Sequence, residues 1–442
     1  MNQTATSVCS LATLRNEIDS HAVGEEMYRL IEDLYPICRS ITGDGVRQTL
    51  RILGEHIPLE VHEVVSGTPV FDWVVPKEWN IRDAYVKNAA GERVIDFREH
   101  NLHVLNYSVP VKKTVSLAEL REHLFASSEH PEQIPYRTSY YKENWGFCVS
   151  QKEYDALEEG QYEVCIDSSL ADGHLTYGEC YLPGDSEQEV FFSAHVCHPS
   201  LANDNLSGIA LSVALAHHLA QVRRHYSYRF VFAPGTIGAI TWLARNEDRV
   251  SHIRHGLIFA CVGDRVKAVY KRSRRGAEID AAVEHVLRHA SDEFEILPFS
   301  PYGYDERQYC SPGFDLPMGC LMKSPPGSFE EYHTSADNLD LVRPAFLADS
   351  FRKCLDIICV LEGNGRYLNR NPKCEPMLGK RGLYGAMGGT ERKATEMAML
   401  WVLNYSDGNH TLLDIAETAN IPFARIREAA ELLCNGGLLE IA

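Results

Sequence analysis

The sequence has no run of about 18 apolar residues, the length that a helix needs to cross a bilayer. Its N-terminus also lacks the basic start and apolar run of a secretory signal. It has 13 cysteines but no Cys-x-x-Cys pair, so we expect reduced and mostly buried thiols rather than a disulfide framework. Together these absences predict a cytoplasmic protein without a membrane partner.

Positive charge is also scarce. The chain has 43 Lys and Arg against 61 Asp and Glu, a net charge of −18. Binding to phosphates needs clustered cations that release counterions, so the charge argues against nucleic acid as the main partner. The 442 residues are enough for about three units of roughly 150 residues each.

Strands and helices alternate from Val190 to about Gly363, an order that predicts an α/β fold with a mostly parallel sheet between helices. Two helices are expected before Pro58, and short strand-like runs follow, including one at Leu102–Val109. We therefore predict an α/β domain from residues 1–58 and 185–363. A β-rich domain, residues 59–184, is inserted into it, and a linker at 364–390 follows it.

Residues 391–442 have helices and a Gly-Gly turn at winged-helix spacing. This range carries eight acidic and four basic residues, whereas a helix that reads a DNA groove needs the opposite sign. The pattern favours packing or formation of a homo-oligomer over DNA binding.

The stretch FFSAHVCHPSLANDNLSG, residues 191–208, is the most informative part of the chain. His195 follows an apolar strand and Asp204 lies in a turn, so both can reach the crevice at the carboxyl ends of parallel strands. His333 follows another apolar run, LPMGCLM. Two imidazoles and a carboxylate suit zinc with one position left for water, whereas a single isolated histidine would more often be structural.

Three motifs resemble those of the co-catalytic zinc aminopeptidases, a clan that includes glutaminyl cyclases. They are His195 with Asp204-Asn205-x-Ser207-Gly208, Tyr332-His333-Thr334-x-x-Asp337, and Asp305 with Tyr309 and Gly313. A closer resemblance, to bacterial aminopeptidase-like proteins with a β-rich insert and a winged-helix tail, rests on runs at 38–43, 140–148, 271–275 and 303–309.

The resemblance implies a three-layer zinc-peptidase-like sheet and one Zn²⁺, with a second possible. It also implies hydrolysis of an amide bond next to a free amine in a peptide or an amino-acid conjugate. His195, Asp204 and His333 would be the metal ligands.

One departure from the resembled family bears on activity. The family carries two glutamates, a general base and a metal ligand, where this chain has Gly235 and Thr236, and a metal-binding aspartate where it has Ala260. A hydrolase would need another base, for which Asp264, Asp305, Glu330 and Glu331 are candidates. Alternatively the chain is a metal-binding scaffold without turnover, so the favoured interpretation, a metallo-aminopeptidase-like hydrolase, stays open.

Several neighbouring residues have secondary roles in this interpretation. His198 could ligate the metal or orient its ligands, and Cys197 stands where the resembled proteins carry an acid that supports the first histidine; a supporting role is favoured for both. A nucleophilic role for Cys197 or Cys310 is a weaker alternative that needs a nearby base. Bidentate arginines and aromatic walls are typical of substrate sites. The candidate substrate-binding residues are Arg39, Tyr141, Trp145, Arg272, Arg274, Arg275, Arg307 and Tyr332.

Overall fold

The computed structural model describes residues 10–290, 292–383 and 390–442. Its contacts divide the chain into two compact units, one with residues up to 276 and residues 295–352, the other with residues 277–294 and 353–442. Among the described residues no helix is long and apolar enough to cross a membrane. The predicted cytoplasmic location stays a prediction.

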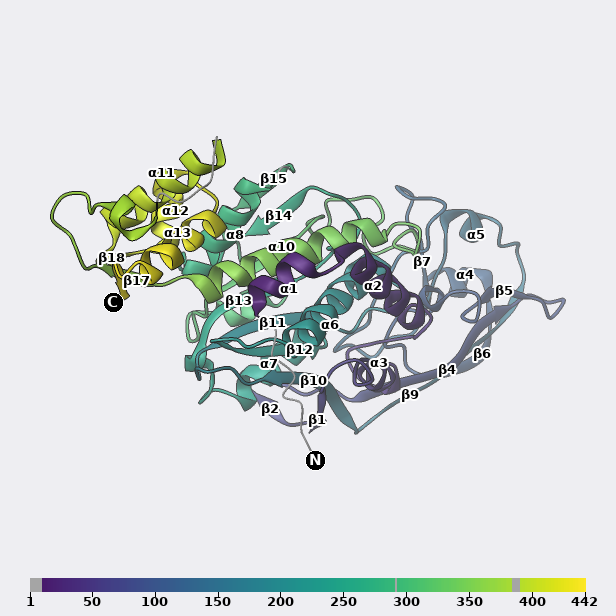
Figure 1. The fold of residues 1–442 in the computed structure, drawn as a ribbon. Coiled ribbons are helices and arrows are strands. Elements are labelled where there is room, and N and C mark those ends of the chain that lie inside the picture. Colours follow the sequence, from purple (N-terminus) through teal and green to yellow (C-terminus); the bar gives the residue numbers. More distant parts are fainter. Residues whose placement is uncertain (1–9, 291, 384–389) are drawn as a thin grey trace, which may run out of the picture. The chain divides into compact units, whose positions relative to one another are not determined.

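The first unit is built on one eight-stranded sheet with the strand order β1-β10-β12-β11-β13-β16-β14-β15 (Figure 1). The four central strands, from β12 to β16, are parallel, and the outer strands β1, β10 and β14 pair antiparallel. The bounds are β1 Glu60–Val65, β10 His174–Leu182, β11 Glu189–His195, β12 Ser227–Ala233, β13 Ile253–Phe259, β14 Ala268–Lys271, β15 Phe294–Leu297 and β16 Met318–Met322.

Crossover connections make this unit three-layered. The chain steps from β11 to β12 in one direction and from β12 to β13 in the other. Because parallel crossovers are right-handed, the two connecting helices cover opposite faces of the sheet. Outside residues 59–184, this unit contains the helices α1 Leu11–Glu17, α2 Ser20–Leu34, α3 Asp44–Leu53, α6 Gly208–Leu219, α7 Ile237–Arg245 and α9 Glu306–Tyr309, with 3-10 turn η3 Val250–His252.

Every residue of β11 and β12 is buried. Side chains alternate between faces along a strand: Phe191 contacts Trp242 of α7 and Tyr309 of α9, whereas Phe192 stacks on Phe259 of β13. His195 lies four residues after Phe191 and therefore on the same face. His195 therefore lies at the carboxyl end of β11, on the face that carries Phe191.

The range predicted as an insert contains a four-stranded antiparallel sheet, β5-β4-β9-β6. The two ends of this range form β1 and β10, which are hydrogen-bonded in the central sheet. The central sheet therefore includes part of residues 59–184. The division into domains otherwise stays a prediction. The elements are β2 Pro69–Val70, β3 Trp73–Val74, β4 Glu78–Lys87, β5 Arg93–Asp96, η1 Asn101–His103, β6 Val111–Ser116, α4 Leu117–Arg121, β7 Leu124–Phe125, β8 Phe147–Cys148, α5 Gln151–Asp155 and β9 Gln161–Ala171.

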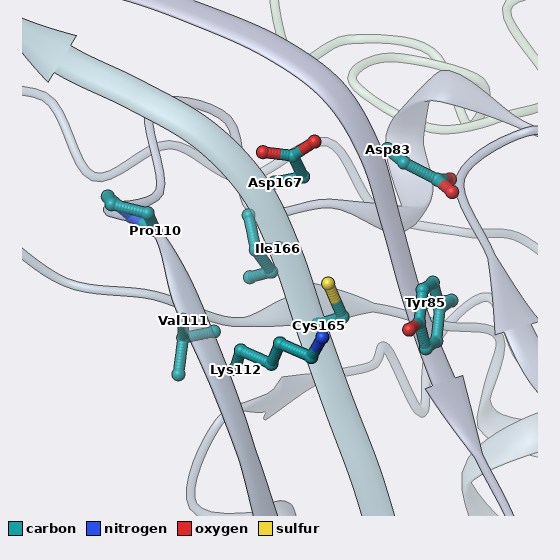
Figure 2. Close-up of a pocket in the computed structure, with 8 residues that line it drawn as sticks. All are labelled: Asp83, Tyr85, Pro110, Val111, Lys112, Cys165, Ile166 and Asp167. Carbon is teal, nitrogen blue, oxygen red and sulfur yellow. The ribbon is translucent and has the colours of Figure 1, made fainter.

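A hollow of about 510 Å³ lies on this four-stranded sheet, and Figure 2 shows Tyr85, Lys112 and Cys165 around it. Its two acids are already paired: Asp83 with Arg93 at 2.8 Å, and Asp167 with Arg82. The hollow is therefore no free acidic site.

The second unit contains a three-stranded antiparallel sheet, β18-β17-β19, together with the helices α8, α11, α12 and α13. His285 of α8 holds the turn between the last two helices: its Nδ1 contacts Glu417 at 2.5 Å and its Nε2 accepts the N–H of Phe423 at 2.9 Å. A helix that reads DNA uses its N-terminal residues. In α13 the first residue, Phe423, is instead hydrogen-bonded to His285 of α8. Absence of nucleic-acid binding stays a prediction. The elements are α8 Glu278–His289, β17 Arg366–Asn369, η4 Leu378–Arg381, α11 Thr390–Tyr405, β18 Asp407–Thr411, α12 Leu412–Ala419, α13 Phe423–Asn435 and β19 Leu439–Ile441, and α10, Pro344–Gly363, precedes β17.

Two local predictions were wrong. Residues 102–109 form no strand, because Asn106 uses its amide to bind the Arg39 carbonyl and the Ser40 hydroxyl. The predicted linker begins with β17, which pairs with both β18 and β19. In each case the deciding hydrogen bonds come from residues distant in the sequence.

Arg229 provides a test of the sheet. It forms ion pairs with Glu189 and Glu179 of the two neighbouring strands, and all three side chains are largely buried. We expect Arg229→Met to lower the free energy of unfolding by about 3–5 kcal/mol, because it leaves two buried carboxylates unpaired. Denaturant melts measure this, with Arg223→Met as control. Since the Arg223–Asp185 pair is exposed, its loss should cost at most about 1 kcal/mol; equal effects would contradict the argument.

Candidate metal centre

The carboxylate of Asp204 is fully buried at the carboxyl end of the sheet. It belongs to an irregular turn, Ala202–Ser207, between β11 and α6. The carboxylate of Asp337 fixes this turn by accepting the backbone N–H groups of Asn203 at 2.6 Å and of Asp204 at 2.9 Å. Burial raises the pKa of Asp337 to about 8.

Three histidines from two distant segments converge on Asp204. Its Oδ1 lies 2.9 Å from Nε2 of His195, and its Oδ2 lies 3.0 Å from Nε2 of His333 and 3.8 Å from Nε2 of His198. The structure therefore brings together all three predicted ligands. Burial opposes the charge on Asp204, yet the neighbouring imidazoles hold its pKa well below its usual range.

His198 is placed inside this cluster and not only behind it, which differs from the predicted supporting role. Its Nε2 lies 3.2 Å from Nε2 of His333, and burial lowers its pKa, so the ring is neutral and can offer a lone pair. Ligand atoms at 2.0–2.1 Å from a tetrahedral zinc stand about 3.3 Å apart. The contacts of 2.9, 3.0, 3.2 and 3.8 Å among these groups are of that order. His195, His198 and Asp204 each offer a ligand atom, and these atoms all lie within 4.8 Å of one another, whereas His333 lies outside that group and contacts the second oxygen of Asp204. This donor set suits a divalent cation.

Three tyrosines complete the cluster: Tyr304 and Tyr136, which the sequence analysis did not single out as site residues, and Tyr332, which it predicted as a substrate contact. The ring of Tyr304 stacks on His195 and its hydroxyl donates to Asp204 at 2.6 Å. Tyr332 stacks on His333, and Tyr136 from the insert meets the edges of His333 and His198. Tyr304 precedes Asp305 in a matched motif, and this adjacency was the only signal that could have revealed it.

Cys197 supports His198 and not the first histidine: its Sγ lies 3.2 Å from Nδ1 of His198. Burial raises the pKa of this thiol, and also that of Cys310, whose Sγ donates to backbone carbonyls. Both thiols are therefore protonated at neutral pH. This removes the reason for a cysteine nucleophile.

Asp305 lies where a side chain at position 235 would extend. A Cβ on Gly235 would be 3.2 Å from Cβ of His195 and 3.5 Å from Oδ1 of Asp305. That Oδ1 and Nδ1 of His195 are both buried and without a hydrogen-bond partner among the described residues. Burial, aided by Glu306, raises the pKa of Asp305 to about 8. The structure thus supplies a carboxyl group beside the glycine.

The other predicted bases have different surroundings. Asp264 is bound by Ser324 and by Arg265 at 2.8 Å, which occupies one of its oxygens with structural contacts. Glu331 contributes its backbone carbonyl, which accepts the N–H and hydroxyl of Thr334, and its side chain is only half-buried. Glu330 is exposed. Of the four candidates, Asp305 is the one placed beside Gly235.

The predicted substrate-binding residues divide into two groups. Arg39 is fully buried and donates to the carbonyls of His198 and Leu34, so it holds the loop after β11. Trp145 stacks on His123, and Arg274 pairs with Asp315. The remaining members keep exposed or half-buried side chains and stay predictions as substrate contacts: Tyr141, Arg272, Arg275, Arg307 and Tyr332.

Residues 28–364 match the family model described as a domain of unknown function, DUF4910, and residues 365–441 match a winged helix-turn-helix model. A Clostridium acetobutylicum protein is 55% identical over 425 residues, which are 96% of this chain and 98% of that protein. It is named as a candidate polysaccharide biosynthesis protein with an aminopeptidase-like domain.

Two of the solved structures that resemble this chain illustrate the fold. The crystal structure of a candidate peptidase from Clostridium acetobutylicum has a TM-score of 0.94 at 53% identity, covering 98% of this chain and 100% of that one. A zinc aminopeptidase from Bacillus subtilis has a TM-score of 0.56 at 11% identity, covering 76% and 94%, a likeness of fold alone. The predicted aminopeptidase-like α/β fold and winged-helix tail are confirmed.

The cluster predicts how zinc will bind. We expect one zinc ion per chain, and Asp337→Asn should weaken binding about 10–100-fold, because it loosens the turn that holds Asp204. His333→Ala should weaken it more, since it removes a ligand. Elemental analysis and competition with a chelating dye measure both. His217→Ala, an exposed histidine on α6, is the control, and unchanged affinity in His333→Ala would contradict the ligand set.

Proposed function

The chain belongs to the family described as a domain of unknown function, DUF4910, and from its buried centre we propose that it is a zinc-dependent hydrolase of an amide bond next to a free amine. The observation that carries this proposal is the pairing of Gly235 with Asp305. The space at the position of the missing base is not filled by an aliphatic side chain but adjoins a buried carboxyl group.

The residues fit distinct parts in hydrolysis. Zinc held by His195, Asp204 and His333 would polarise the carbonyl of the substrate and acidify a water molecule. Once Asp305 is ionised, its Oδ1, which has no partner among the described residues, would accept the proton of the attacking water and return it to the leaving amine. The side chain of His333 is 33% exposed, so the centre is open to substrate on its side.

A second candidate function is suggested by His198. If it is a fourth ligand, the coordination is closed, as in structural zinc sites, and the chain is a metal-binding scaffold. The two functions predict different results for His198→Ala. A structural ion would bind much more weakly, whereas a catalytic ion held by three other ligands would keep its stoichiometry.

The substrate is proposed more coarsely. The name of the Clostridium relative refers to polysaccharide biosynthesis, which supports including amides of amino sugars beside aminoacyl amides in a substrate panel. An amino-acid or amino-sugar conjugate would present the amide and the free amine that the proposal requires.

Moving the carboxylate from position 305 to position 235 tests whether Asp305 is the general base. We expect Asp305→Asn to lower kcat by about 10²–10⁴-fold, the usual contribution of general acid–base catalysis. Gly235→Glu alone should not raise activity, because its side chain would meet Asp305. The double variant Gly235→Glu/Asp305→Ala should recover activity over Asp305→Ala.

Asp264→Asn is the matched control for this series and should retain zinc binding and most of the activity. An active Asp305→Asn enzyme, or a wild-type protein that turns over no member of the panel while zinc-loaded, would reject the proposal.

The raised pKa of Asp305 also predicts a pH dependence of stability in the metal-free protein. Its folded pKa of about 8 exceeds the unfolded value of about 4, so between these values the folded state holds more protons. Stability therefore falls as pH rises through this window. In Asp305→Asn the decline should be shallower by up to about 1.4 kcal/mol per pH unit. Denaturant melts in chelator from pH 5 to pH 8 measure this difference. If the stability curves of the wild type and of Asp305→Asn are parallel, Asp305 is exposed to water and its pKa is not raised.

A further inference from the structure

A cavity of about 150 Å³ adjoins the proposed metal centre at Tyr304. The same tyrosine stacks on His195 and donates to Asp204, so one side chain borders both the cavity and the cluster. The cavity is lined mainly by apolar and aromatic side chains, among them Leu297, Met322 and Pro325. A substrate whose scissile bond lies at the cluster could therefore place a neighbouring group there.

A buried ion pair forms the polar part of this cavity. Lys271 pairs with Oε1 of Glu306, and these side chains are only 8% and 1% exposed. The second carboxylate oxygen of Glu306 has no hydrogen-bond partner among the described residues. A buried acceptor left unpaired is costly, which indicates that a ligand or water supplies a donor.

Lys271 leaves a complementary donor. An ammonium group has three N–H bonds; one is directed to the carbonyl of Tyr302 at 2.7 Å and one to Glu306. The third remains for an acceptor. The pair has no net charge, so it offers a single acceptor and a single donor side by side, with no preference for an ionic ligand.

Gly303 keeps this arrangement possible. Its φ is +148°, and a Cβ there would lie 2.2 Å from Oε1 of Glu306 and 2.4 Å from Nζ of Lys271. Any other residue would have to displace the ends of both side chains, and its side chain would also be strained at this positive φ.

We propose that this cavity is the subsite that binds a neutral amide group of the substrate. The amide N–H donates to the free oxygen of Glu306, and the amide carbonyl accepts from Lys271. The apolar walls take the carbon atoms attached to the amide. Such a group occurs in the side chain of glutamine and in the acetamido group of an N-acetylated sugar. The inference rests on the proposed function, which places the scissile bond at the metal next to this cavity. Binding of the amide group itself does not require turnover.

Binding of small probes tests the subsite without catalysis. We would measure calorimetric affinities of zinc-loaded Asp305→Asn protein, in which turnover is suppressed, for two pairs: L-glutaminamide against L-methioninamide, and N-acetyl-D-glucosamine against D-glucose. The first member of at least one pair, which alone carries a side-chain amide or an acetamido group, should bind about tenfold more tightly, since each hydrogen bond to a charged group contributes substantially. The pair that shows the preference identifies the source of the amide.

The matched variant replaces both charges, Lys271→Met with Glu306→Met, because a buried pair exchanged for apolar side chains tends to leave stability intact. It should abolish the preference while zinc stoichiometry stays unchanged. Gly303→Ala should weaken amide binding without removing either charge. Equal affinities within both pairs, or a preference that survives the double replacement, would overturn the subsite. Failure of the hydrolase proposal would instead appear as absent turnover in wild-type protein that still discriminates the probes.

Discussion

Burial of the Asp204 carboxylate is the constraint on which the site depends. A carboxylate removed from water must be hydrogen-bonded and offset by positive charge. Asp204 meets the first requirement through His195, His333 and Tyr304, which come from the end of β11, the loop after β16 and the segment before α9. The second requirement is what a divalent cation would supply. One buried acid therefore draws three distant segments to a single point.

The fold makes this convergence possible because the connection from β11 to β12 and the connection from β12 to β13 lie on opposite faces of the sheet. A crevice forms at the carboxyl ends of strands where such a reversal occurs. His195 is the last residue of β11 and pairs with Ala233, the last residue of the parallel strand β12, and Gly235 follows two residues later. Their closeness follows from strand pairing, whereas Asp305 reaches the same point from outside the sheet.

Three consecutive residues contact three different parts of the site. Tyr304 binds the Asp204 carboxylate, Asp305 lies beside Gly235, and Glu306 pairs with Lys271 in the adjoining cavity. The segment thus links the metal ligands, the proposed base and the proposed subsite. A base supplied here, and not from the end of β12, explains how a glycine at 235 is compatible with hydrolysis.

The sequence by itself determined the α/β order and the winged-helix tail, and it indicated His195, Asp204 and His333 as candidate ligands, because strand ends, turns and ligand types are local patterns. Only the tertiary structure decided that His198 joins them, that Cys197 is an inert buried thiol, and that Asp305 adjoins Gly235 while Asp264 and Glu331 do not. The physical reason is that distance and desolvation depend on how loops after different strands pack together. No spacing along the chain records that packing.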